Sequence, residues 1–121
     1  MGKRSLSLAI KRHKQKLKNL TPQEAEKLDE VKTLAMELMA IHNVAHMKFE
    51  YGYGWRYLGC CSATKITLQL NFVLQGDMNK IRNTLLHEIA HAIVGPDKGH
   101  RIEWQEKATE LGVRWWRSYH K

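Results

Sequence analysis

The segment from Ile81 to Ile93 constrains the fold most, because apolar side chains cover most of its surface when it is drawn as a helix. These apolar residues are Ile81, Leu85, Leu86, Ile89, Ala90, Ala92 and Ile93. A helix that is apolar around much of its circumference lies in the interior of a domain. A single polar stripe interrupts it and consists of Thr84, His87, Glu88 and His91. We therefore expect a buried helix whose polar side chains have partners inside the protein, since burying them alone is costly.

Residues with known roles at helix ends mark the boundaries of this helix. Asp77 or Asn79 can cap its N-terminus by accepting a hydrogen bond from a backbone N–H. At the other end, Gly95 suits the left-handed conformation of a C-terminal cap, and Pro96 cannot continue the helix. The helix is therefore expected to end near Val94.

Two further helices are predicted, one before and one after this segment. Thr21-Pro22-Gln23-Glu24 combines an N-cap threonine, a proline at the first helical position and a glutamate at the capping-box position. An apolar stripe then continues at helical spacing to about His42 and consists of Leu28, Val31, Leu34, Ala35, Leu38 and Ile41. The later helix follows His100 and ends at Gly112, with one face formed by Trp104, Ala108 and Leu111.

The periodicity changes between Met47 and Phe72. Short aromatic segments separated by glycines are typical of strands joined by tight turns. The stretch from Ile66 to Leu70 alternates, and we expect Ile66, Leu68 and Leu70 to face the core. We predict a small antiparallel sheet of about three strands. An exposed strand edge near Lys65–Leu70 is the surface that we expect to accept an extended peptide as an added strand.

The positive charge is concentrated at the N-terminus. The chain has a formal net charge of +8, and residues 1–20 hold seven of its 20 Lys and Arg residues but none of its 12 acidic residues. Such a basic arm attracts polyanions, so DNA is a candidate partner. The helical spacing of Leu6, Ile10, His13, Leu17 and Leu20 suits an anionic membrane surface or packing on the domain equally well. We therefore expect one α+β domain over residues 21–121, preceded by a basic arm over residues 1–20.

Several classes of protein are disfavoured by the rest of the composition. No apolar run is long enough to span a bilayer, and basic residues interrupt the N-terminus too often for a signal peptide. Cys60 and Cys61 are adjacent, and two neighbouring thiols make neither a disulfide framework nor a zinc ribbon. These features predict a cytoplasmic protein.

The polar stripe of the buried helix has the spacing of a metal site. His87-Glu88-Ile89-Ala90-His91 is an H-E-x-x-H sequence, and a four-residue step on a helix turns by only about 40°, so both imidazoles can bind one ion. Glu88 lies about 100° around the helix from His87, where a general base for a metal-bound water belongs. A catalytic zinc site takes three protein ligands and keeps one position open. His100 is our candidate for the third, with Glu103 as the alternative ligand or as a partner that orients the ring of His100. His100 can also be explained as a cap of the helix that follows it.

These residues resemble the SprT-like (Spartan-type) zinc metallopeptidase family. The resemblance covers Leu58-Gly59-Cys60, Lys65-Ile66-Thr67-Leu68, the run from Thr84 to Ala92, and Gly99-His100-x-x-x-Trp104. It implies a minimal zincin-like fold, a Zn²⁺ ion held by His87, His91 and His100, and Glu88 as the catalytic base. For several relatives it also implies cleavage of proteins held on DNA. Arg101 departs from the glycine that is usual after the third histidine, which alters the shape expected beside the site.

Two functions follow as hypotheses. The first is a zinc metalloendopeptidase that acts on a protein or peptide, with DNA bound through the basic arm. The second is a nucleic-acid-binding module in which the zinc is structural and no reaction is catalysed. A three-histidine endoribonuclease fits less well, because a glutamate directly after the first histidine favours peptidase chemistry.

Overall fold

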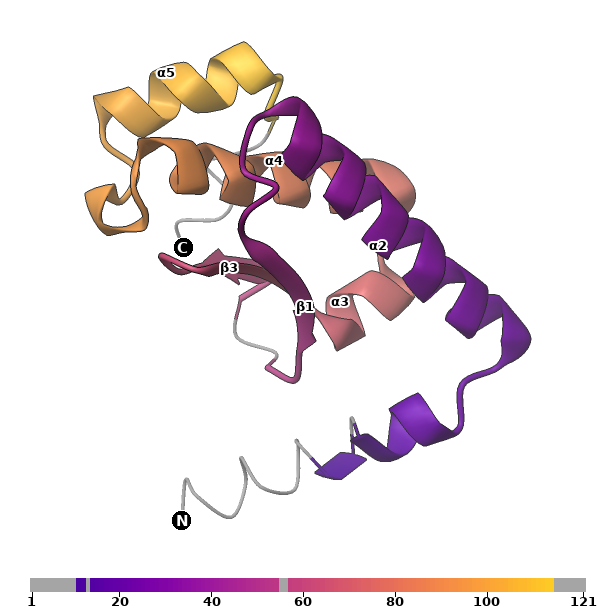
Figure 1. Cartoon of the computed structure of the whole chain (residues 1–121). Helices are drawn as coiled ribbons and strands as arrows, with labels where there is room; N and C mark the ends of the chain where they lie inside the picture. Colours follow the sequence, from indigo (N-terminus) through magenta and orange to yellow (C-terminus); the bar gives the residue numbers. More distant parts are fainter. Residues whose placement is uncertain (1–10, 13, 55–56, 115–121) are drawn as a thin grey trace.

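The computed structural model describes residues 11–12, 14–54 and 57–114 of the chain. In this part the fold is α+β, with a three-stranded sheet covered by helices (Figure 1). The helices are α2 (Pro22–Ile41), α3 (Leu70–Gln75), α4 (Met78–Val94), the 3₁₀ helix η1 (Pro96–Lys98) and α5 (Ile102–Leu111). The strands are β1 (Lys48–Gly52), β2 (Gly59–Cys61) and β3 (Lys65–Gln69). No helix of the described residues combines the length and the apolar character needed to cross a membrane.

The boundaries of the long helices confirm the predictions from sequence. The capping box at the start of α2 is present, with the Thr21 side chain accepting from the Glu24 N–H and the Glu24 carboxylate accepting from the Thr21 N–H. Asp77 is the N-cap of α4 and accepts from the Lys80 N–H at 2.8 Å. Gly95 ends α4 with a φ of 121°, which a residue with a side chain rarely adopts.

Helix α4 is the central element, as its apolar sequence predicts. Every residue from Asn83 to His91 is buried. Figure 1 shows α4 between α5 on one side and the sheet on the other, with α2 crossing it. The core around it includes Val31 of α2, Ile66 and Leu68 of β3, and Trp104 of α5. The polar stripe of α4 is therefore enclosed by packed elements.

The sheet is mixed, so the prediction of an antiparallel sheet is wrong for one of its two pairings. The strand order is β1-β3-β2, in which β2 is antiparallel to β3 but β1 is parallel to it. The short turn from Cys61 to Lys65 forces β2 and β3 to run in opposite directions. The chain leaves β1 and crosses to the far side of β3 before it forms β2, so β1 and β2 do not pair. Strand periodicity does not encode this crossing.

The predicted open edge at Lys65–Leu70 is also wrong. Strand β3 is the central strand and is paired on both sides, with β1 in register from Lys48↔Lys65 to Gly52↔Gln69. Ile66 and Leu68 nevertheless face the core with no exposed surface, as predicted, although Thr67 between them is also buried. Leu70 is buried too, but it begins α3, a short helix that the sequence did not predict. The edges of the sheet belong to β1 and β2.

The described end of the basic arm touches the domain. Residues 11–12 and 14–18 are helical, and Leu17 and Leu20 pack against the core. Lys16 forms a salt bridge of 2.9 Å with Glu24. The predictions that concern Leu6, Ile10 and His13 lie outside the described residues.

Candidate metal centre

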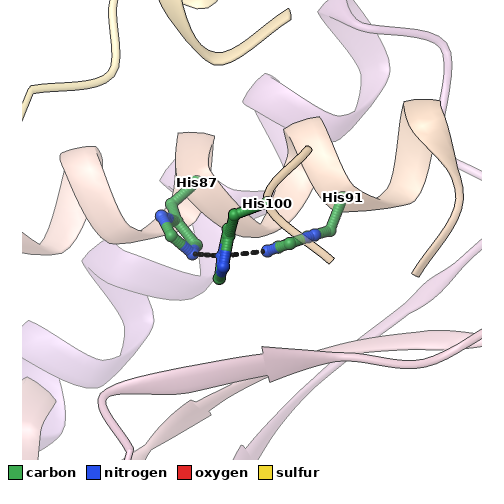
Figure 2. A group of neighbouring side chains, drawn as sticks. All are labelled: His87, His91 and His100. Atoms are coloured by element: carbon green, nitrogen blue, oxygen red, sulfur yellow. Dashed lines mark hydrogen bonds between the residues drawn. The ribbon is translucent and has the colours of Figure 1, made fainter. Parts of the chain in front are cut away.

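Helix α4 and the turn after it bring three histidines together (Figure 2). The Nε2 atoms of His91 and His100 lie 2.8 Å apart, and those of His100 and His87 lie 3.2 Å apart. His87 and His91 are buried and His100 is half-buried. In Figure 2 the rings of His87 and His91 extend from the same side of α4, and the ring of His100 lies between them. The three side chains form a group that can hold a metal ion.

The bonding capacity of these nitrogens favours a shared cation over hydrogen bonds among all three rings. A single Nε2 atom carries either one proton or one lone pair, so that of His100 cannot form a full hydrogen bond with both neighbours. A cation accepts all three lone pairs at once. Zn–N bonds of about 2.0–2.1 Å in a tetrahedral site place the ligand nitrogens about 3.4 Å from each other. The two observed separations are shorter than this, so the rings would move apart slightly to hold an ion of this kind.

His100 reaches the site through a turn that contains two glycines with positive φ. Gly95 donates its N–H to the His91 carbonyl at 2.8 Å as α4 ends. After η1, Gly99 has a φ of 62° and no atom within 4 Å of an added Cβ, so its backbone conformation, not lack of space, makes glycine suitable. The next helix begins with Arg101 as its N-cap, so His100 is not the cap. The Gln105 side chain donates to the His100 carbonyl at 3.0 Å and fixes the backbone of this residue.

Glu88 lies beside the three histidines. Its Oε2 atom is 4.0 Å from Nε2 of His87, and its side chain is 7% exposed. Burial raises the pKa of the Glu88 carboxyl to about 8. A nearby divalent cation acts in the opposite direction, because it favours the carboxylate. This carboxyl is therefore close enough to the histidines to exchange a proton with a group held there.

The alternative third ligand is not part of the cluster. Glu103 is exposed on the first turn of α5, and among the described residues the only group with metal-ligand spacing consists of the three histidines. Thr84, the remaining member of the polar stripe, donates its hydroxyl to the Lys80 carbonyl at 2.9 Å. The stripe thus divides into one hydroxyl that bonds within the helix and three ionisable side chains, which His100 joins from the turn after α4.

Trp104 contacts all three histidines, which the sequence did not predict. It is fully buried, and its ring centroid lies 4.7 Å from that of His87, 5.1 Å from that of His91 and 4.5 Å from that of His100. Its indole N–H donates to the His87 carbonyl at 3.3 Å. The sequence placed it only on one face of the helix that follows His100. The available signal was its position one helical turn after His100 on the apolar face of α5.

Strand β2 forms the wall of the site opposite α4. Cys61 packs against the core while Cys60 is exposed, as expected for neighbours on a strand. Burial, the Glu88 carboxyl and Cys60 together raise the pKa of the Cys61 thiol to about 12. Cys61 is therefore a neutral thiol near Glu88 at physiological pH.

The family model for the SprT-like family matches residues 45–117, which include the sheet, α4, His100 and Trp104. No curated protein matches the chain. The matched segment covers well over half of the sequence and contains the whole histidine cluster. The chain therefore belongs to the SprT-like family.

Proposed function

We propose that the protein is a zinc-dependent metalloendopeptidase. The observation that carries this proposal is the convergence of three imidazole Nε2 atoms beside a buried carboxyl group. The described residues offer three ligands in this group, and three protein ligands with one open position are typical of catalytic zinc sites. Membership of the SprT-like family supports the same chemistry.

His87, His91 and His100 would hold the ion through Nε2. A zinc ion held there would supply Lewis-acid activation of water and of the substrate carbonyl. Glu88 accepts the proton of the attacking water on its carboxylate and then donates it to the departing amine. Its buried position suits the first of these transfers, because burial raises the pKa of the carboxyl and a carboxylate with a raised pKa is a stronger base. Trp104 keeps the imidazole rings in place by packing against each of them.

The substrate backbone is expected to pair with the open edge of β2. The Leu58 carbonyl accepts from Gln69, and Ser62 donates to the Lys65 carbonyl, so these residues point toward β3. Because successive residues alternate along a strand, the backbone groups of Gly59 and Cys61 point to the other edge. No hydrogen bond within the described residues uses them. An extended peptide added there would pass directly beside Glu88.

Glu88→Gln tests the mechanism. This variant should keep zinc, because the three ligands remain, but lose hydrolysis by about a hundredfold or more, because the base is gone. Zinc content after dialysis and the initial rate on a fluorogenic peptide measure the two properties. Glu103→Gln makes the same chemical change on the exposed side of α5 and should match the parent in both.

His87→Ala should lose zinc and hydrolysis together. The mechanism is wrong if Glu88→Gln cleaves as fast as the parent, or if His87→Ala binds zinc normally and stays active.

We propose DNA as the polyanion that the basic arm binds, which would bring the peptidase to DNA-associated proteins. Lys11, Arg12, Lys14 and Lys18 are exposed, while Leu17 and Leu20 face the core. The affinity for duplex and single-stranded DNA should fall with added salt, and removal of residues 1–20 should weaken it. Salt-insensitive binding that survives the truncation would exclude the arm from this role. A chain that binds DNA and zinc but never cleaves a peptide would instead favour the binding-module hypothesis.

A further inference from the structure

Strand β2 packs along α4 and leads away from the histidines. Beside the histidines, the Cys61 thiol lies near the Glu88 carboxyl. One turn earlier in α4, a Cβ placed on Gly59 would lie 3.4 Å from the Thr84 methyl group. Another turn earlier, Leu58 and Lys80 line the same cavity. The strand and the helix therefore run side by side in the same direction, and the cavity lies at the end of β2 nearest the start of α4.

The cavity has a volume of about 300 Å³, which accommodates one amino-acid side chain. Its walls are formed by the end of β3, by α3 and by the first turn of α4. The residues that decide its chemistry are Leu58, Gln69, Asn71, Phe72, Gln75 and Lys80. Leu58 and Phe72 provide apolar contact surface for an aliphatic stem.

Two of the three amides in the cavity keep donors available. Oε1 of Gln69 already accepts from the Gly54 N–H at 2.9 Å, and Oδ1 of Asn71 already accepts from the Gln75 side chain at 3.0 Å. Gln69 and Asn71 therefore keep N–H groups to donate, while Gln75 keeps its oxygen as an acceptor. Among the described residues of the lining, Lys80 is the only charged one, and its ammonium group forms no ion pair or hydrogen bond with the described part of the chain. Donors and one cation around an apolar stem fit a carboxylate side chain.

The distance along α4 sets the position of this side chain in a substrate. Lys80 precedes His87 by seven residues, which is about 10.5 Å along a helix. An extended peptide covers this distance in about three residues. A peptide that passes Glu88 along the edge of β2 would thus place a side chain in the cavity about three residues from the scissile bond.

We infer that this cavity is a specificity subsite, in which Lys80 binds the carboxylate of a glutamate or aspartate of the peptide substrate. The inference rests on the proposed peptidase function, because it assumes that a peptide lies along the edge of β2. It gives the protein a preference for acidic sequences near the cleavage site, independent of the arm.

The test uses neutral peptides that are identical except for one glutamate, which is moved along the chain, with glutamine peptides as references. Full-length zinc-loaded Glu88→Gln protein reports binding by fluorescence anisotropy, and the parent reports cleavage. One glutamate position should improve binding about tenfold over glutamine, the magnitude of a hydrogen bond to a charged group. Lys80→Glu, in the same Glu88→Gln background, should remove this preference and favour a lysine at that position. Lys32→Glu makes the same charge change on the exposed surface of α2 and should leave the preference unchanged.

The outcomes separate the subsite from the peptidase proposal. Glutamate-selective binding that depends on Lys80, without cleavage by the parent, supports the subsite as a peptide-binding site and contradicts the peptidase. Cleavage that ignores the position of the glutamate, or a preference that persists in Lys80→Glu, overturns the subsite. A loss of DNA affinity in Lys80→Glu with unchanged peptide binding overturns it too, because the cavity would then contact nucleic acid.

Discussion

Helix α4 and strand β2, which lie side by side at the histidines, differ in how their structures arise. Helix α4 is specified by its own sequence, since the cap, the apolar faces and the stop all lie between Asp77 and Pro96. Strand β2 has three residues and no apolar pattern of its own, and it is held by pairing with β3 and by packing on α4. His87, Glu88 and His91 lie on the helix, and the backbone edge that can pair with a peptide lies on the strand. Local structure thus fixes these three side chains, and tertiary contacts fix the position of the strand edge.

The comparison predicts the largest loss of stability for a substitution that removes packing from α4. Trp104→Ala should lower the free energy of unfolding by about 3–5 kcal/mol, because it leaves a large cavity against three histidines. Denaturant unfolding of the protein with and without zinc measures this loss. Trp104→Phe retains an aromatic ring but loses the hydrogen bond to the His87 carbonyl, so its cost should be smaller. If Trp104→Phe binds zinc as tightly as the parent, the indole N–H does not position His87.

Substitutions in β2 should destabilise the protein less. Here the destabilising change is an added side-chain atom, because β2 lies close to β3. A Cβ on Gly59 would lie 2.8 Å from the Thr67 carbonyl oxygen and 3.0 Å from the Leu68 side chain. Gly59→Ala should therefore displace β2 from β3 and cost about 1–3 kcal/mol. Cys60→Ala changes the exposed neighbour on the same strand and should cost less than about 0.5 kcal/mol. Equal unfolding midpoints for the two variants would show that the close approach of β2 to β3 does not depend on Gly59.

The smallest expected effect concerns the contact between β2 and α4, where Cys61 lies near Glu88. Cys61 should react slowly with iodoacetamide at pH 8, because burial and the Glu88 carboxyl raise its pKa to about 12 and keep the thiol protonated below that pH. Cys60 is exposed and should be labelled first. Glu88→Gln removes a contribution that raises the pKa, so labelling of Cys61 should become modestly faster. Mass spectrometry of the labelled peptide separates the two sites, and an unchanged rate in Glu88→Gln would show that the two side chains do not interact.

The sequence predicted those features that depend on neighbouring residues. The capping box of α2, the limits of α4 and the left-handed Gly112 after α5 are each specified within one or two helical turns. His87, Glu88 and His91 share a helix, so their relative positions followed from its pitch. His100 required an assumption about the path of the turn, which the two positive-φ glycines make possible.

The features that sequence reasoning missed depend on contacts between distant segments. The strand order, with β3 at the centre, is decided by which neighbours bury Ile66 and Leu68, and alternation looks the same in either orientation. Leu70 fits the end of an alternating strand, yet the chain turns there into α3. The aromatic contacts of Trp104 depend on the angle at which α5 crosses α4, which no local pattern reveals.

His100 follows His91 by nine residues and lies in the turn between α4 and α5. An ion bound by both would tie the segment that leads into α5 to α4 and close a short loop of the chain, which restricts the unfolded state. Chelation should therefore increase amide hydrogen exchange in α5 before it affects α2, which carries none of the three histidines.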